Sequence, residues 1–162
     1  MRKTVGIAAG IFGAAVVAVV VASCGSDSTG PARKTYVANL SPANEVPLKT
    51  TTGTGVVTFV DNVTTIDWEM TLTNMTNVTQ SHIHGPAAAG TNGSVIINLW
   101  FPITPTGTVN GLVARGSITN AMNVNVSLDS LRTLFNNGMA YVNVHTAANP
   151  GGEIRDQVHP VP

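Results

Sequence analysis

The chain has 162 residues, eight of them Lys or Arg and eight Asp or Glu, so its formal net charge is zero at pH 7. Charged residues make up only 10% of the chain and form no basic patch, which argues against a nucleic-acid partner. Its one cysteine, Cys24, excludes an intramolecular disulfide, so a folded domain must be stabilised by its hydrophobic core.

The N-terminus has the parts of an export signal. Arg2 and Lys3 precede an apolar run from Val5 to Val21, and small residues come just before Cys24. The ending Ala22-Ser23-Cys24-Gly25 resembles the lipobox of bacterial lipoproteins, in which the cysteine receives a diacylglycerol before the peptide is cut. We therefore predict a lipoprotein signal peptide over residues 1–23 and lipidation of Cys24. The alternative is an uncleaved anchor, although 17 apolar residues are at the lower limit for a membrane span.

Both alternatives place the rest of the chain outside the cytoplasm. Removing residues 1–23 from the 162 leaves 139, a length that suits one domain. Residues 24–34 are small and polar without apolar periodicity, which predicts a flexible, lipid-attached tether. We expect an extracytoplasmic protein held at a cell membrane by its lipid, and the sequence leaves open which membrane and which leaflet.

From Thr35 to His159 the apolar residues follow a period of two, as at Ile66, Trp68, Met70 and Leu72. This alternation is typical of strands with one buried face. Clusters of Gly, Pro, Asn and Thr separate the strands as turns. The predicted strands are Thr35–Leu40, Gly55–Val60, Ile66–Leu72, Thr79–His84, Ser94–Phe101, Leu112–Ile118, Met139–His145 and Glu153–His159. Residues 35–159 are thus predicted to form an all-β antiparallel sandwich, either Greek-key and Ig-like or dismutase-like.

One short helix is predicted near residues 127–137. Ser127 can cap its N-terminus, an apolar stripe includes Leu131 and Phe135, and Gly138 supplies a stop. Two or three turns carry too little apolar area for a membrane or partner helix. We expect a connector that closes one end of the sandwich.

Three strands are expected to present polar rows on the face opposite to their apolar residues. His82 and His84 are two residues apart, so both point to the side opposite to Ile83. The same alternation places two further rows outward: Tyr141, Asn143 and His145, then Glu153, Arg155 and Gln157. The apolar residues between them are expected to face the core.

If these strands are neighbours, His82, His84, His145 and Glu153 can converge on a metal ion. Imidazole nitrogens suit Zn²⁺ and Cu²⁺ alike. The His-x-His pair resembles the local arrangement in copper/zinc superoxide dismutases, but no bridging histidine and no disulfide cysteines accompany it. The alternative is that His82 and His84 only hydrogen-bond to turn backbone or to Glu153.

No complete catalytic constellation is recognisable. Asp67 and Glu69 fall on the wet face of a regular strand, and no serine has a nucleophile motif around it. The polar side chains Tyr141, Asn143, Arg155 and Gln157 are therefore candidates for a ligand-binding or structural face, with Arg155 able to pair with an anion. A non-catalytic role is expected, and a metal-binding or redox role is the alternative.

Four motifs in order resemble the CHRD domain, the module named after chordin. They are Tyr36–Pro47, His82-Ile83-His84-Gly85-Pro86, Tyr141–Thr146 and Pro150–Arg155, and the resemblance covers about Thr35 to Val158. It implies an extracellular β-domain that acts as a binding or structural module of the cell envelope, with a protein or an envelope polymer as partner, and it implies no enzyme activity. Two positions depart from the family pattern, where glycine is usual: Pro42 and Asp156. By alternation Asp156 faces inward, so either the strand bulges there or its register ends early.

Overall fold

The computed structural model describes residues 33–103, 106–120 and 126–162. The predicted signal peptide, Cys24 and the tether up to residue 32 lie outside the described residues. Within the described ranges, no helix has the length and apolar character that crossing a membrane requires.

The described part of the chain is built mainly of β-strands, as the alternation predicts. Most predicted strands are found, with ends that coincide with the prediction or differ from it by at most four residues. The elements are β1 (Thr35–Leu40), η1 (Pro42–Asn44, a 3-10 helix), β2 (Thr54–Asp61), β3 (Ile66–Thr76), β4 (Val78–His84), β5 (Val95–Trp100), β6 (Thr108–Ile118), α1 (Leu128–Asn136), β7 (Tyr141–Thr146), β8 (Ile154–Gln157) and β9 (His159–Pro160).

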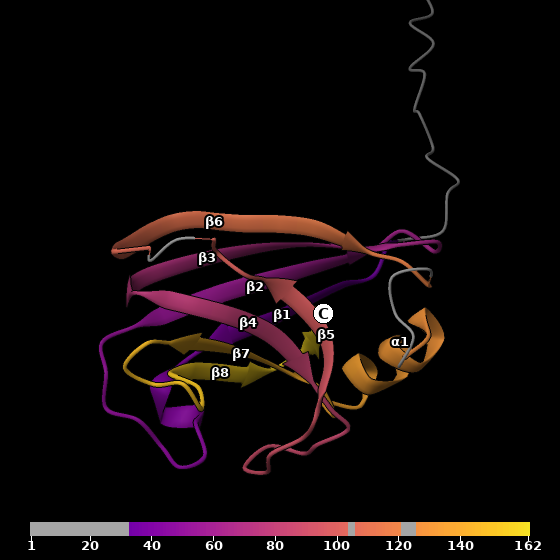
Figure 1. Cartoon of the computed structure of the whole chain (residues 1–162). Helices are drawn as coiled ribbons and strands as arrows, with labels where there is room; N and C mark the ends of the chain where they lie inside the picture. Colours follow the sequence, from indigo (N-terminus) through magenta and orange to yellow (C-terminus); the bar gives the residue numbers. More distant parts are fainter. Residues whose placement is uncertain (1–32, 104–105, 121–125) are drawn as a thin grey trace, which may run out of the picture. The chain divides into compact units, whose positions relative to one another are not determined.

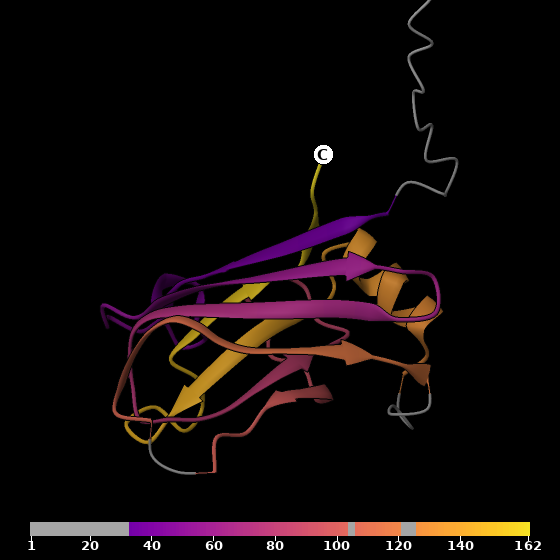
Figure 2. The same cartoon turned by 90° about the horizontal axis from the view of Figure 1, so that it is seen from above.

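The strands form two antiparallel sheets that face each other, so the prediction of an all-β sandwich is confirmed (Figures 1 and 2). One sheet has the order β6-β3-β2-β1-β9 and the other has the order β5-β4-β7-β8. A bridge between Ser41 and Arg155 joins the end of β1 to β8 and so links the two sheets at one edge.

The core lies between the sheets and is formed by the apolar half of each alternating strand. In β3, Ile66, Met70 and Leu72 are completely buried while Glu69 is exposed. In the smaller sheet, Ile83 and Val144 are also completely buried, as predicted. Burying each such side chain contributes about 1.5–3 kcal/mol, which suits a domain without disulfides.

The predicted helix is present as α1, at one end of the sandwich (Figure 1). The Ser127 hydroxyl accepts a hydrogen bond from the Ser130 N–H, and Gly138, with φ of +61°, follows the C-terminus. The Phe135 ring packs 5.2 Å from Tyr36 and 5.0 Å from Phe59, measured between ring centroids. The helix therefore closes the core at this end by inserting an aromatic ring from its buried face.

The last predicted strand differs from expectation because it is divided between the two sheets. Residues of β8 pair with β7, whereas His159 and Pro160 in β9 pair with β1. Asp156 keeps its register opposite Val142, so the strand neither bulges nor ends early there. Its carboxylate accepts hydrogen bonds from the Asn39 N–H (2.9 Å) and the Asn44 side-chain amide (3.0 Å) at the linked edge. These bonds allow an acidic residue at this position.

Candidate metal centre

The outer face of the four-stranded sheet carries the predicted polar rows. Antiparallel pairing places His82 opposite Asn143, which is itself opposite Arg155. It also places His84 opposite Tyr141, which is opposite Gln157. Directly paired residues point to the same face, so β4, β7 and β8 bring these side chains together.

This face is buried, which the sequence did not lead us to expect. The three histidines are 5–8% exposed and Arg155 is 2% exposed. Backbone carbonyls of three loops reach the face: Arg155 donates to Asn44 O (2.6 Å), His84 to Gly93 O (3.0 Å) and His145 to Pro150 O (3.0 Å). The predicted surface is therefore an interior polar layer that is covered by loops.

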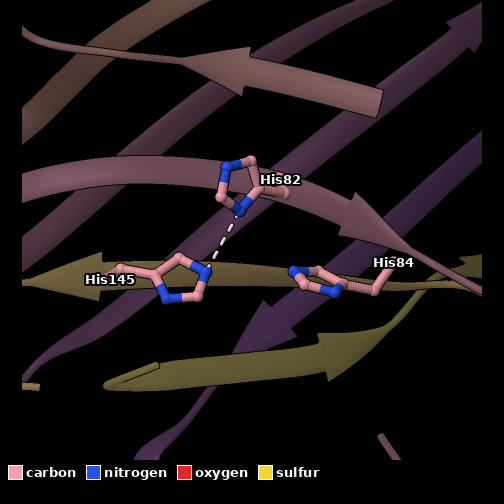
Figure 3. A group of neighbouring side chains, drawn as sticks. All are labelled: His82, His84 and His145. Atoms are coloured by element: carbon pink, nitrogen blue, oxygen red, sulfur yellow. Dashed lines mark hydrogen bonds between the residues drawn. The ribbon is translucent and has the colours of Figure 1, made fainter. Parts of the chain in front are cut away.

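Three imidazoles gather in this layer, two from the C-terminal end of β4 and one from β7. His82, His84 and His145 each offer one ring nitrogen, and these three atoms lie within 4.8 Å of one another. Figure 3 shows the rings arranged around a common space, and a hydrogen bond of 3.1 Å joins His82 Nδ1 to His145 Nε2. Nitrogens that bind one tetrahedral Zn²⁺ lie about 3.3 Å apart. The longest distance between two of these nitrogens would therefore have to shorten by at most about 1.5 Å when an ion binds.

The hydrogen bonds to the loops fix which nitrogen of two histidines is free. A carbonyl oxygen can only accept, so Nδ1 of His84 and Nδ1 of His145 carry the hydrogen that is donated to Gly93 O and Pro150 O. The lone pair of each neutral ring is then on Nε2. In His84 this Nε2 atom is buried and has no hydrogen-bond partner among the described residues.

All three histidines favour the neutral form. Burial lowers the pKa of His82 to about 4, with further lowering by the neighbouring His145 and His84. Burial also lowers the pKa of His84 and the pKa of His145, although the backbone bonds to Gly93 and Pro150 oppose this. Neutral imidazole is the form that binds a metal, so at pH 7 no proton has to be displaced.

Aromatic rings enclose two of the histidines. The ring of His84 is stacked on Tyr141, with centroids 4.9 Å apart and planes 8° from parallel, and the Arg155 guanidinium lies 4.7 Å from the same Tyr141 ring. The ring of His82 packs 5.4 Å from Phe101. These contacts limit the movement of the imidazoles around their side-chain torsions.

Glu153, the fourth candidate ligand, does not join the three histidines. Its carboxylate accepts hydrogen bonds from the Thr146 hydroxyl (2.6 Å) and the Asn149 side-chain amide (3.1 Å). Thr146 is on the face of β7 that holds Val144, opposite to His145. Glu153 precedes β8 and so lies in the turn, where strand alternation does not apply.

The remaining predicted residues of the polar face are held by hydrogen bonds or contacts with the loops that cover it. Gln157 donates to Ala87 O (3.0 Å) and Gly138 O (2.6 Å), and Arg155 donates to the Asn92 side-chain oxygen (2.7 Å). Asn143 lies against Gly152 and the carboxylate of Glu45. Sequence reasoning did not single out Glu45, Asn92 or Phe101, because each reaches the face from a loop.

One of two comparisons with known proteins identifies the family of the chain. A comparison with curated proteins finds no similar sequence. The family model for the CHRD domain matches residues 36–158, which is most of the chain and includes the three histidines and all the strands from β1 to β8 except the first residue of β1. The chain therefore belongs to the CHRD domain family.

Proposed function

We propose that this CHRD domain binds one transition-metal ion, Zn²⁺ or Cu²⁺, through His82, His84 and His145. The observation that carries the proposal is the set of three buried imidazoles whose nitrogens lie within 4.8 Å of one another. Two of them donate their other ring N–H to a backbone carbonyl, at Gly93 and Pro150. Histidines that bind metals are usually oriented by this kind of bond.

The unpartnered nitrogen of His84 supports the same proposal. A buried acceptor without a hydrogen bond costs about 1–3 kcal/mol. A metal ion at the centre of the three rings would satisfy His84 Nε2 and would replace the hydrogen bond between His82 and His145. The alternative of purely structural hydrogen bonds accounts for the bond of His84 Nδ1 to the backbone at Gly93 and for the bond between His82 and His145, but it leaves His84 Nε2 without a role.

Metal analysis of the purified full-length protein in detergent tests the proposal. After incubation with limiting Zn²⁺ or Cu²⁺ and removal of free ion, we expect about one equivalent per chain. His84→Ala and His145→Ala should each reduce this to background, while circular dichroism checks that the variants are folded. His159→Ala is the matched control, because His159 is exposed and lies outside the group. Wild-type protein without stoichiometric metal, or equal losses in the control, would contradict the proposal.

We also propose that the domain works outside the cytoplasm, attached to a membrane through lipid on Cys24. The support is the order of Arg2, Lys3, the apolar run and the small residues before Cys24. In a bacterial host given labelled fatty acid, the wild-type protein and Ser28→Ala should take up the label and lose residues 1–23, whereas Cys24→Ser should take up no label and keep residues 1–23, because lipidation precedes cutting. A wild-type protein that keeps residues 1–23 and takes up no label would support an uncleaved anchor instead.

The role that we propose for the metal-loaded domain is binding rather than catalysis. Its partner would be a protein or a polymer of the cell envelope, in keeping with membership of the CHRD family. Crosslinking in intact cells, followed by purification of the metal-loaded protein and of His84→Ala, tests this role. One partner captured only by the loaded form is expected. Turnover of a substrate without any partner would contradict a binding role.

A further inference from the structure

The proposed metal centre offers three protein ligands, one fewer than Zn²⁺ usually binds. Among the described residues, the group that can hold an ion contains three side chains and no fourth His, Cys, Asp or Glu. Zn²⁺ is most often four-coordinate, and sites with three protein ligands keep the fourth position for water or another external ligand. The neighbours of the group therefore decide whether a fourth protein ligand can reach the ion.

The nearest polar side chains on this part of the sheet are either hydrogen-bonded elsewhere or turned away from the histidines. The carboxylate of Glu153 is bonded to Thr146 and Asn149. The hydroxyl of Tyr141 accepts a hydrogen bond from the Gly93 N–H at 3.2 Å. The side chain of Asn143 is turned toward Gly152, within 2.6 Å of the position that a Cβ atom would take there.

The side of the centre beside His82 is covered by a side chain that is itself half exposed. Each of the three histidines keeps 5–8% of its surface exposed. The Phe101 ring packs against His82 and is itself 50% exposed, so this imidazole contacts a side chain that reaches the surface of the molecule. Such a ring can shield the ion from larger molecules while a small ligand passes beside it.

We propose that the metal ion bound by His82, His84 and His145 keeps one open coordination position, which takes water or a small anion that enters beside Phe101. This inference rests on the proposed metal binding. The step is a ligand exchange: the entering anion donates a lone pair to the ion, the metal–water bond breaks, and no electron is transferred. The class of ligand is set by the single free position and the positive charge of an ion that is held by three neutral imidazoles.

Azide added to the Co²⁺-loaded full-length protein tests this inference. Co²⁺ replaces Zn²⁺ and reports its coordination through visible absorption bands. We expect azide to change these bands in a saturable titration with one site per ion, while the metal content stays constant. Phe101→Ala should lower the apparent Kd for azide several-fold or speed its binding. Leu112→Ala, which removes a similarly exposed apolar side chain in the other sheet, should leave both unchanged.

The outcomes separate the two proposals. Stoichiometric Co²⁺ whose bands do not respond to azide would overturn the open position and leave metal binding intact. Loss of the ion on addition of azide, or identical azide binding in wild type and Phe101→Ala, would overturn the proposed position beside Phe101. Failure to bind Co²⁺, Zn²⁺ and Cu²⁺ would overturn the proposed function, and the open position with it.

Discussion

The ring of Tyr141 lies parallel to the imidazole of His84, with the ring centroids 4.9 Å apart. Tyr141 belongs to β7 and His84 to the neighbouring strand β4, and the two residues pair directly across the sheet. The Arg155 guanidinium approaches the Tyr141 ring from β8, on the other side of β7. The stacked pair therefore joins three strands and holds the ring plane of one proposed metal ligand.

Replacing Tyr141 should weaken metal binding through the orientation of His84. We expect Tyr141→Leu to lower Zn²⁺ affinity about 10-fold to 100-fold, the range found when partners of metal ligands are removed. Tyr141→Phe keeps the stack and loses only the hydroxyl bonded to Gly93, so its affinity should stay close to wild type. Competition with a chromophoric chelator measures both affinities. Equal losses in the two variants would show that the hydroxyl, and not the stack, positions His84.

The alternation of apolar residues predicted that the three histidines point away from the core, but the group itself depends on β4 and β7 being neighbours, which the sequence left open. Ile83 and Val144 are strongly apolar and sit between polar neighbours, so their burial forces His82, His84 and His145 to one common face. The covering loops could not be predicted in this way. Which carbonyl approaches an imidazole depends on the path of a turn, and turns such as the one before Glu153 have no side-chain period. Strand alternation alone therefore predicts an exposed polar face, whereas in the structure the loops bury the face that holds the histidines.

The strand order and some strand ends also needed information beyond the local sequence. The β3–β6 pair has one irregularity in register between Met70 and Thr71 and a second after Leu72, and it continues beyond both, so β6 begins at Thr108 and not at the predicted Leu112. The division of the last strand depends on Val158, which is buried and whose N–H donates to Ala140 O. A single apolar residue near the C-terminus does not reveal that its two neighbours pair in different sheets.

Gly152 is predicted to be essential for the loop beside the polar layer, whereas its neighbour Gly151 is not. Gly152 has φ of +123°, and a Cβ atom there would lie 2.5 Å from the Asn143 side chain and 2.8 Å from Glu45 Oε1. Gly152→Ala should reduce the free energy of unfolding by about 2 kcal/mol or more, through backbone strain and the clash with buried groups.

Gly151→Ala serves as the control because a Cβ atom at Gly151 meets nothing within 4 Å. Its stability should stay within about 0.5 kcal/mol of wild type. Urea unfolding of both variants measures the difference. Similar stabilities for the two variants would show that the loop relaxes and that Gly152 is not required.

The ion pair between Asp61 and Arg132 should stabilise the docking of α1 on β2. The guanidinium donates twice to this carboxylate, at 2.7 Å and 2.9 Å, and both side chains are mostly buried, with 15% and 21% exposed. Asp61→Asn should lower stability by about 1–3 kcal/mol at pH 7. Asp129→Asn should lower it by about 0–1 kcal/mol, because the Asp129 side chain is 93% exposed.

The pH dependence of this ion pair gives a second measurement. Hydrogen bonds from Arg132 hold the pKa of Asp61 below its ordinary value of 3.8. The stabilisation is therefore present above pH 3.8 and is lost as the pH falls through the lowered pKa. Thermal unfolding should show wild type and Asp61→Asn converging only in strong acid. A constant difference over this range would contradict the assignment to the charged form.

Glu45 should make the domain less stable as the pH rises from about 4.5 to about 7. The side chain is 4% exposed, and burial raises its pKa from 4.5 to about 7. The charge of Arg155, a backbone hydrogen bond at Val46, the charge of Lys49 and the amide of Asn143 oppose this rise and are outweighed by burial. Below pH 4.5 the folded and unfolded chains both keep the proton, so Glu45 carries no penalty. Between the two values only the unfolded chain ionises, which lowers the free energy of unfolding by at most about 3 kcal/mol before it levels off.

Glu45→Gln isolates this effect from the titration of the histidines, which is common to both proteins. Glu45 Oε1 and Asn143 Oδ1 are buried acceptors without a hydrogen-bond partner among the described residues, and both lie within 3 Å of one point above Gly152. A protonated Glu45 or a glutamine can donate to Asn143 there. We therefore expect Glu45→Gln to match wild type in urea unfolding at pH 4 and to exceed it at pH 8, while Glu69→Gln, at an exposed position of β3, changes neither. A Glu45→Gln protein less stable than wild type at pH 8 would mean that the ionised carboxylate is favoured by Arg155 after all.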